Sequence, residues 1–188
     1  MRQLIVQEFV TIDGLAAGPE GEVDFIPAAT EGDSGVAESQ MHFIDTIDAI
    51  VLGRTTYEMF AGYWPTATGD DKPFADKINT ITKIVFTKTL DSAPWGSFES
   101  ATVSRDDPRE EVPRLREKDG KDLVVWGSLS LVQSLADAGL VDEYQLWLLP
   151  VVLGGGKPLF ARGQSTAMEL LEAKTTDKGA TLLRYRPL

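Results

Sequence analysis

Short apolar runs rich in β-branched residues alternate with helical segments along this chain, and this alternation limits the possible folds more than any other feature. Runs of this kind lie at residues 4–11, 48–53, 83–87, 101–104 and 122–126. Their length and composition are typical of strands that are buried on both faces of a sheet. Strands that alternate with helices predict an α/β fold with a mainly parallel central sheet.

Four segments between these runs complete this part of the fold. We predict a helix over residues 36–47, a helical turn over 54–60, a helix that begins near 106–108, and a helix over 129–138. Residues 12–35 are rich in glycine, alanine, proline and acidic residues, and we expect a long loop there. Because long loops in compact domains usually carry function, this loop is a candidate lid.

The last quarter of the chain has a different pattern. We predict a strand over residues 143–149, a break over 150–156, and two strands joined by a turn at 176–179. These strands would add an antiparallel edge to the parallel sheet. The chain shows no linker, repeat or low-complexity segment, so we predict a single domain over residues 1–188.

Composition excludes several classes of protein. The net charge of −11 argues against a nucleic-acid-binding protein. No apolar run approaches the roughly 18 residues that a membrane helix needs, so we expect no membrane partner. The absence of cysteine fits a reducing compartment, and we expect a cytoplasmic protein. No lysine or arginine lies between Arg2 and Arg54, so an anionic ligand would find its partners later in the chain.

Three predicted strands end in small, hydroxyl or basic residues. These junctions are residues 52–56, 86–89 and 126–130. Ligands of open parallel sheets bind at the carboxyl ends of the strands, and a helix that begins there offers free N–H groups to phosphate. Each junction alone is also explained as ordinary helix-entry sequence, but three together favour a dinucleotide site.

The run Gly154–Gly155–Gly156–Lys157 is not a Walker loop. It lacks the required spacing, and Pro158 follows the lysine where serine or threonine would coordinate magnesium. Three consecutive glycines are explained either by close approach to a ligand or by a tight turn. The sequence leaves both explanations open.

Catalytic constellations are scarce. His42 is the only histidine and there is no cysteine, so we expect no multi-histidine or thiolate metal site, and no residue is assignable as catalytic. A hydride transferred from a cofactor needs little from side chains beyond position and shielding from water. The scarcity of catalytic side chains therefore suits a reductase better than a hydrolase.

Several segments resemble the dihydrofolate-reductase-like superfamily. LIVQEFVTIDGLAAG is similar to its first strand and lid, AIVLGRTTYEMF to its Gly-Arg-x-Thr-Tyr cofactor turn, and KIVFTKTL to the strand that meets the 2′-phosphate of NADPH. DLVVWGSLSLVQSLADAGLVDEYQLWLLPVVLGGGKPLF resembles the C-terminal half of the riboflavin-biosynthesis reductase domain of bacterial deaminase-reductases. The resemblance implies a three-layer dihydrofolate-reductase-like sandwich with NADPH as cofactor.

Carried over by position, the resemblance also implies site residues. Asp13 and Gly14 would open the lid over the nicotinamide. The other implied cofactor contacts are Gly53, Arg54, Thr55, Thr56, Thr87, Lys88, Trp126, Gly127, Ser128, Leu129 and Ser130. Ser128 departs from the family's usual second glycine. Glu38, in the expected first turn of the helix over 36–47, and Asp33, just before it, are the candidates for substrate binding.

The resemblance implies hydride transfer to a small pterin-like or ribosylamino-pyrimidine heterocycle, as in 5-amino-6-(5-phosphoribosylamino)uracil reductase. A true dihydrofolate reductase and a non-catalytic, dimeric nucleotide-binding protein are the alternatives. A homodimer is also implied. Residues 143–160 support a dimer independently, because one strand of a small sheet cannot readily bury the apolar side chains of Leu146, Trp147, Leu148, Leu149, Val151, Val152 and Leu153.

Overall fold

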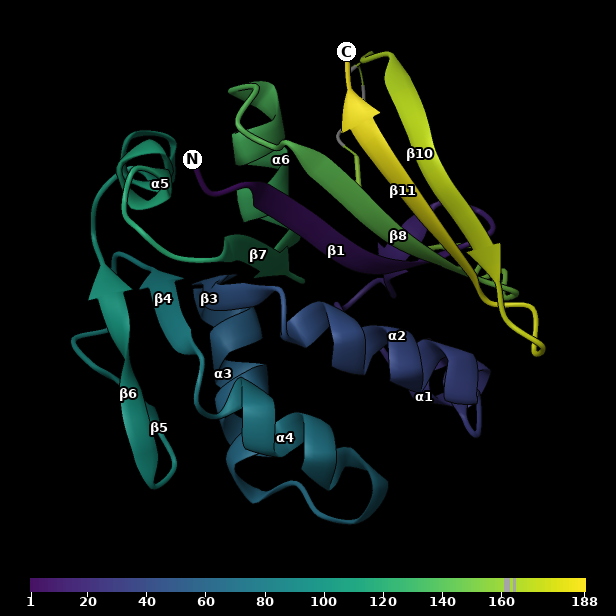
Figure 1. Cartoon of the computed structure of the whole chain (residues 1–188), viewed down its shortest axis with the longest axis horizontal. Coiled ribbons are helices and arrows are strands. Elements are labelled where there is room, and N and C mark those ends of the chain that lie inside the picture. The colour runs from purple at the N-terminus through teal and green to yellow at the C-terminus, as the bar shows by residue number, and fades with distance from the viewer. Residues whose placement is uncertain (161–162, 164) are drawn as a thin grey trace.

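The computed structural model describes residues 1–160, 163 and 165–188. Nine of the strands in these residues form one sheet, in the order β10-β11-β8-β1-β7-β3-β4-β6-β5 (Figure 1). The strands are β1 (Leu4–Thr11), β3 (Ile47–Gly53), β4 (Thr82–Phe86), β5 (Ala93–Trp95), β6 (Phe98–Ser104), β7 (Asp122–Trp126), β8 (Glu143–Leu149), β10 (Met168–Thr175) and β11 (Thr181–Pro187). Two short strands, β2 (Leu15–Ala17) and β9 (Lys157–Pro158), pair separately.

The centre of the sheet is parallel, as the sequence predicts. β1 pairs in parallel with β7 on one side and β8 on the other, and β3 pairs in parallel with β7 and β4. Seven of the eight residues of β1 are buried, because helices cover both faces of the sheet. A strand buried on both faces needs apolar residues at nearly every position, and this explains the continuous apolar runs.

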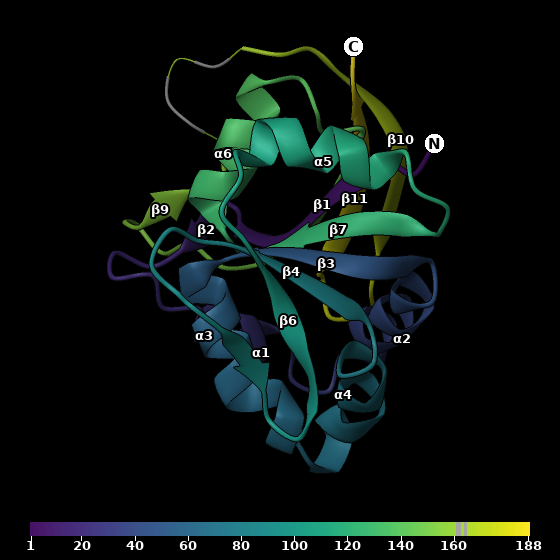
Figure 2. The same cartoon turned by 90° about the vertical axis from the view of Figure 1, so that its left-hand side faces the viewer.

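Helices form a layer on each face of the sheet (Figures 1 and 2). α5 (Pro108–Arg116) and α6 (Leu129–Asp137) cover one face. α1 (Phe25–Thr30), α2 (Ser34–Ile44), α3 (Arg54–Tyr63) and α4 (Lys72–Ile78) cover the other, together with the 3-10 turns η1 (Trp64–Thr66) and η2 (Gly69–Asp71). The fold is therefore the expected three-layer α/β sandwich.

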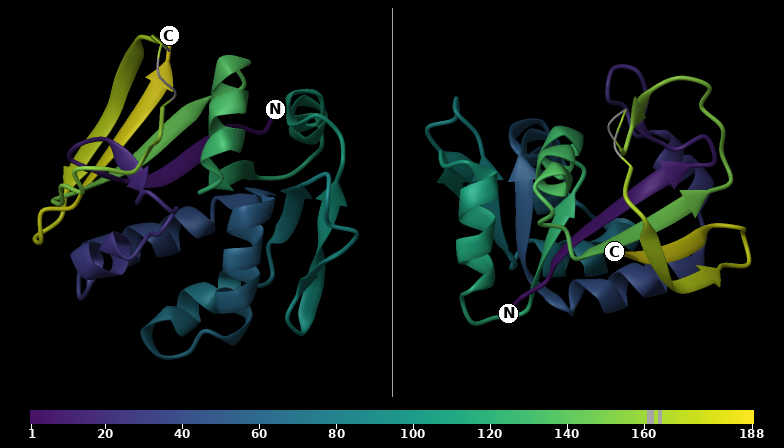
Figure 3. Two further views of the ribbon diagram at one scale, coloured as in Figure 1. Left: turned by 180° about the vertical axis from the view of Figure 1, so that it is seen from behind. Right: turned by 90° about the horizontal axis from the view of Figure 1, so that it is seen from above.

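The antiparallel edge is also confirmed. β11 pairs antiparallel with β8, and β10 pairs antiparallel with β11, so that the two form a hairpin at one end of the sheet (Figure 3). β8 therefore lies between two strands instead of at an edge. Trp147 and Leu149 are buried in a core cluster that also contains Phe25 of α1. The expectation that residues 143–160 cannot bury their apolar side chains within one chain is wrong for these two residues.

Three local predictions need correction. The helix predicted over 36–47 begins at Ser34 and ends at Ile44, because Asp33 caps its start and both the N–H and the hydroxyl of Thr46 bond to the Phe43 carbonyl. Ile47 belongs to β3 instead. The loop predicted over 12–35 contains β2, α1 and the start of α2, while α4 and β5 lie where no element was predicted.

None of the helices in the described part of the chain is long and apolar enough to cross a membrane.

Candidate functional site

The three strand-to-turn junctions lie at one edge of the sheet. β7, β3 and β4 are parallel neighbours, so their carboxyl ends meet at that edge. α3 follows β3 directly, and α6 begins at Leu129 after β7 and a two-residue turn. We call residues 53–56, 87–89 and 126–130 the strand-end site.

Two of these junctions are cross-linked by hydrogen bonds. The Gly53 N–H donates to Ser128 Oγ at 2.9 Å, and the Ser128 N–H donates to Thr56 Oγ1 at 2.8 Å. Gly127 and Ser128 both have φ of 55°. A Cβ at Gly127 would lie 2.9 Å from Thr56 Cγ2, so the turn requires glycine there. The Ser128 hydroxyl thus joins the two turns, which a second glycine could not do.

The helices that begin at this site lack side-chain caps. No side chain caps the first N–H groups of α3, whose first turn includes the exposed Thr55, or of α6, which opens with Leu129 and Ser130. Asp33 caps α2 and Asp107 caps α5, whereas α1 and α4 also lack a side-chain cap, so α3 and α6 differ from these in beginning at the carboxyl edge of the sheet. Uncapped N–H groups at a helix start, together with the helix dipole, suit an anion such as phosphate.

Basic side chains stand beside these helix starts. Arg54 is exposed, and its guanidinium donates to Thr89 Oγ1 and to Glu58 Oε1, at 2.9 Å and 2.8 Å. The Lys88 ammonium donates to the carbonyl of Arg105. Thr87 Oγ1 lies 3.3 Å from Thr89 Oγ1. Through Thr89, the structure therefore joins Arg54 to the turn after β4 that carries Thr87 and Lys88. Thr89 belongs to the predicted junction but was not among the implied cofactor contacts.

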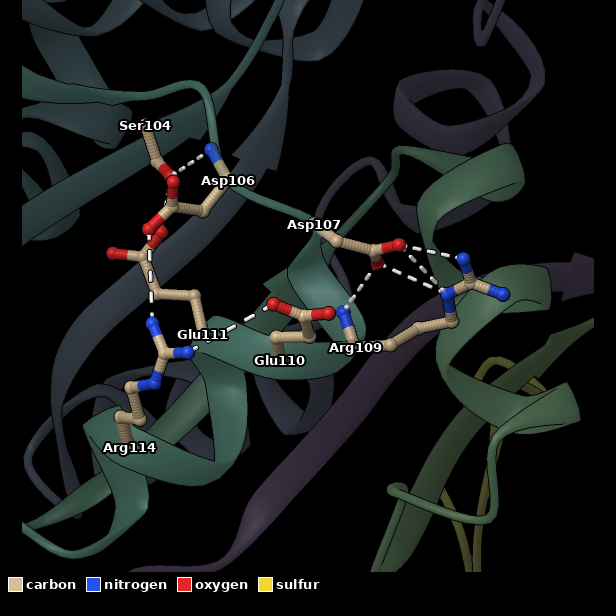
Figure 4. Close-up of polar contacts among 7 residues, drawn as sticks. All are labelled: Ser104, Asp106, Asp107, Arg109, Glu110, Glu111 and Arg114. Atoms are coloured by element: carbon tan, nitrogen blue, oxygen red, sulfur yellow. Dashed lines mark hydrogen bonds and ion pairs between the residues drawn. The ribbon is translucent and has the colours of Figure 1, made fainter.

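The start of α5 carries a cluster of ion pairs and hydrogen bonds (Figure 4). Asp107 accepts hydrogen bonds from the side chain and the backbone N–H of Arg109, and these bonds lower the pKa of Asp107 to about 2. Arg114 lies 3.8 Å from both Asp106 and Glu110. The Arg109 and Arg114 guanidinium groups therefore have carboxylate partners, and Asp107 also interacts with the charge of Lys88.

Asp13 binds the chain's own glycine run. Its carboxylate accepts from the Thr11 hydroxyl at 2.6 Å and from the Gly154 N–H at 2.8 Å, and these bonds lower its pKa. A Cβ at Gly156 would overlap the Ala17 carbonyl oxygen, and φ there is +152°. Gly14, with φ of +77°, has open space around it. The glycine run therefore turns the chain, and at Gly156 it packs against the β2 backbone, as the tight-turn explanation predicts.

Neither of the two acidic candidates for substrate binding is hydrogen-bonded to the strand-end site in the described part of the chain. Asp33 is buried; one of its oxygens caps α2 and the other accepts from the Thr176 hydroxyl at 2.6 Å. Glu38 lies in the second turn of α2, not the first, because the helix begins at Ser34. It is exposed and two residues from the buried Val36, so it points away from the sheet. Asp33 acts as a structural cap, and Glu38 does not face the sheet.

A buried chain of hydrogen bonds runs across the sheet from Trp126. The indole N–H donates to Gln7 Oε1 at 2.9 Å, the Gln7 amide donates to Gln145 Oε1 at 3.2 Å, and the Gln145 amide donates to Glu143 Oε1 at 2.8 Å. An indole N–H can only donate and a carboxylate can only accept, so both amide orientations are fixed. Arg184 holds the carboxylate with bonds of 2.7 Å and 3.1 Å. This chain fixes the orientation of the indole beside the Gly127 turn.

Glu8 is a second buried polar residue of β1. Gln7 pairs with Trp126 in the sheet, so Glu8 lies beside Gly127 on the opposite face from Gln7. Its side chain is buried, and its Oε1 has no hydrogen-bond partner among the described residues. Burial raises the pKa of Glu8 well above its ordinary value, and the backbone N–H of Gly127 offsets only part of this. The carboxyl is therefore neutral over a wider pH range than an exposed glutamate.

Two cavities lie outside the strand-end site. A groove of about 920 Å³ runs between α6 and the C-terminal hairpin, near Gln3 and Asp142 at the amino ends of β1 and β8. A smaller cavity of about 440 Å³ lies between Phe25 and the glycine run, where Glu22 and Asp24 give it an acidic lining. In the described residues, no three His, Cys, Asp or Glu side chains are grouped so as to hold a metal ion.

Known proteins share the sequence pattern and the fold of this chain. The family model for the RibD C-terminal domain matches residues 2–182. The chain is 32% identical to the uncharacterized protein YyaP of Bacillus subtilis (strain 168) over 187 residues, which cover 98% of this chain and 94% of YyaP. It is similar in structure to a putative riboflavin biosynthesis protein from Shewanella sp. PV-4, with a TM-score of 0.76, 20% identity and 99% of each chain covered. Dihydrofolate reductase from Enterococcus faecalis, complexed with NADP(H), has a TM-score of 0.64 at 19% identity, with 98% of this chain and 96% of that chain covered.

Proposed function

The chain belongs to the RibD C-terminal domain family, and on this premise we propose that it is a reductase that uses NADPH to reduce a C=N or C=O group of a pterin-like or ribosylamino-pyrimidine heterocycle. One observation carries the proposal. Two uncapped helix starts, joined through Ser128 and flanked by Arg54 and Lys88, meet at the carboxyl edge of a parallel sheet. This arrangement suits the phosphates of a dinucleotide.

The residues present fit NADPH, and each group has a role. The first N–H groups of α3 and α6 would hold the diphosphate. Arg54, Thr89 and Lys88 would hold the 2′-phosphate through charge-assisted and hydroxyl hydrogen bonds. NADPH, when bound, supplies the hydride. The lid, whose Asp13 anchors it to the glycine run, would exclude water from the site.

The choice of cofactor tests the proposal. Each charge-assisted bond to a 2′-phosphate contributes roughly 1.5–3 kcal/mol. NADPH should therefore bind at least about tenfold tighter than NADH, and Lys88→Ala should narrow that gap. Lys174→Ala, on the exposed strand β10, is the matched control and should leave the gap unchanged. Equal affinities of the wild type for the two cofactors in a calorimetric titration would refute the 2′-phosphate assignment.

Turnover separates the reductase from its rivals. Oxidation of NADPH with a ribosylamino-pyrimidine supports the proposed reductase, whereas oxidation with dihydrofolate alone supports a true dihydrofolate reductase. NADPH binding without oxidation of the cofactor by either substrate class supports the non-catalytic nucleotide-binding protein. Both oxygens of Asp33 are engaged within the chain, one by the start of α2 and the other by Thr176, and Glu38 is exposed on α2. This supports the pyrimidine over folate as the substrate.

We also propose that the chain forms a homodimer. With Trp147 and Leu149 buried inside the chain, the supporting apolar surface is the exposed Phe160, Leu170 and Leu171 around the C-terminal hairpin. Sedimentation at micromolar concentration should give twice the chain mass of 20.5 kDa. A monomer under those conditions would refute the dimer.

A further inference from the structure

Glu8 has a carboxyl oxygen that the protein itself does not use. The residue is 7% exposed, and its Oε1 has no partner in the described part of the chain. Alternation along β1 places Glu8 on the same face as Val6 and Val10, which belong to the core cluster that also contains Ala16 and Leu159. An apolar residue would fit this layer at lower energetic cost. A buried polar atom without a partner requires an explanation, and a missing ligand is one of the recognised ones.

The position of Glu8 in the fold points to a ligand. After β1 and the short strand β2, the chain continues into α1 and α2 on one face of the sheet, whereas after the neighbouring β7 it continues into α6 on the other face (Figure 1). Ligands of open α/β sheets bind in the crevice where connections diverge in this way. Glu8 lies at the level of Gly127, the first residue of the turn between β7 and α6, and interacts with its backbone N–H. It therefore lies behind the turn that the proposed function assigns to phosphate.

The chemistry of a neutral carboxyl group narrows the ligand class. Such a group presents one O–H donor and one C=O acceptor on the same edge. A primary carboxamide presents the complementary pair, an acceptor oxygen beside an N–H donor. The two can therefore form two hydrogen bonds at once.

We propose that Glu8 is a cofactor-binding residue that recognises the carboxamide of the nicotinamide ring. This inference rests on the proposed function, because it assumes that NADPH occupies the strand-end site. The lactam edge of a heterocyclic substrate has similar hydrogen-bonding chemistry. However, Gln7 and Trp126 face the opposite side of the sheet from Glu8, and their polar groups are bonded to each other. Glu8 alone has an unused polar atom on the α6 side of β1.

A cofactor analogue tests the proposal without any substitution. In the reduced 3-acetylpyridine analogue of NADPH, a methyl group replaces the amide nitrogen, which removes the N–H donor. Isothermal titration of the wild type should show NADPH binding about tenfold tighter than this analogue, the expected effect of one lost buried hydrogen bond. Equal affinities would overturn the proposal.

Variants at Glu8 complete the test. Glu8→Leu should weaken NADPH binding by roughly tenfold or more and abolish the preference over the analogue. Its affinity for 2′-phospho-ADP-ribose, which lacks the nicotinamide, should stay at the wild-type value. Glu8→Gln can still pair with a carboxamide and should bind NADPH within a few-fold of the wild type. Because Glu8→Leu removes a buried unpaired oxygen, its thermal midpoint without cofactor should equal or exceed that of the wild type.

The outcomes separate this inference from the proposed function. If the wild type binds neither NADPH nor 2′-phospho-ADP-ribose, both proposals fail. If NADPH binds but Glu8→Leu keeps its preference over the analogue, only the role of Glu8 fails. Equal weakening of NADPH and 2′-phospho-ADP-ribose in Glu8→Leu would also overturn it, because Glu8 would then act on the Gly127 turn and not on the carboxamide.

Discussion

The Glu143–Arg184 pair gives the most quantitative prediction for this fold. Glu143 is buried, and its two oxygens accept from Arg184 Nε at 2.7 Å and Nη2 at 3.1 Å, while its Oε1 also accepts from Gln145 at 2.8 Å. Glu143→Gln keeps the size of the side chain but removes the charge, and its amide NH₂ cannot accept from the guanidinium. One charge-assisted bond is lost and a second is weakened.

The size of the expected loss of stability depends on how exposed the Arg184 side chain is. Hydrogen bonds to charged groups contribute roughly 1.5–3 kcal/mol each. Breaking a fully buried ion pair costs about 3–5 kcal/mol, but the Arg184 side chain is 35% exposed, so water compensates part of the loss. We therefore expect Glu143→Gln to lower the free energy of unfolding by about 2 kcal/mol.

Urea unfolding measures this change directly. A double-mutant cycle with Arg184→Met should give a coupling energy between roughly 0.5 and 3 kcal/mol, as for other directly bonded pairs. Glu172→Gln is the matched control, because Glu172 bonds the same arginine at 3.0 Å from a half-exposed position and should cost under about 1 kcal/mol. If Glu143→Gln stays within about 0.5 kcal/mol of the wild type, or shows no coupling to Arg184, the reasoning from burial and hydrogen bonding is refuted.

Three further predictions concern the loops and the buried ionisable groups. Gly156→Ala should lower the free energy of unfolding by roughly 2 kcal/mol or more, because its Cβ would meet the Ala17 carbonyl and φ there is +152°. Gly155 has open space around it, so the control Gly155→Ala should leave the free energy of unfolding nearly unchanged in the same urea titration. Lys83 is buried and its pKa is lowered to about 8, so the unfolded chain binds more protons and stability should rise between about pH 8 and 10.5. Lys83→Met should abolish this rise and stabilise the protein at pH 7 by roughly 1–2 kcal/mol, and an unchanged pH profile of stability in the variant would contradict the assignment. Burial raises the pKa of Glu8 above the ordinary 4.5, so the folded state binds more protons just above that pH and stability should fall as the pH rises; Glu8→Gln should flatten this fall in thermal melts, and an equally steep fall in the variant would count against it.

The central strands were predictable because burial on both faces leaves one acceptable composition. Residues 4–11 and 122–126 match β1 and β7 at both ends, and 48–53 misses only the first residue of β3. Helix ends were less predictable, because they depend on single hydrogen bonds. Asp33 caps α2 and also bonds to Thr176, a partner 143 residues away. A sequence pattern shows that an acidic residue precedes a helix, but it does not show which groups bond to that side chain.

The glycine run at 154–156 also depends on contacts that the sequence does not reveal. Sequence reasoning could recognise that three glycines need a cause, but the cause lies in residues more than 130 positions earlier. Asp13 accepts from the Gly154 N–H, and the Ala17 carbonyl leaves no space for a Cβ at Gly156. The pairing of β2 with β9 and the hydrogen bond from the Ile12 N–H to the Val151 carbonyl bring these segments together. Long-range contacts of this kind leave no periodic trace in the sequence.

The adjacent polar residues Gln7 and Glu8 are the feature of the β1 sequence that indicates polar contacts inside the protein. They interrupt an otherwise apolar strand that is buried on both faces, where each polar side chain costs stability unless it is bonded. Because neighbouring residues of a strand point to opposite faces, the pair serves two different purposes. Gln7 is bonded at both ends and orients Trp126, so its role is complete within the protein. Glu8 keeps one oxygen unbonded beside the Gly127 turn, so its role is complete only when a ligand is bound. Replacing each residue by leucine should therefore have opposite effects on the unliganded protein: a loss of stability at Gln7, which leaves the Trp126 N–H unpaired, and none at Glu8.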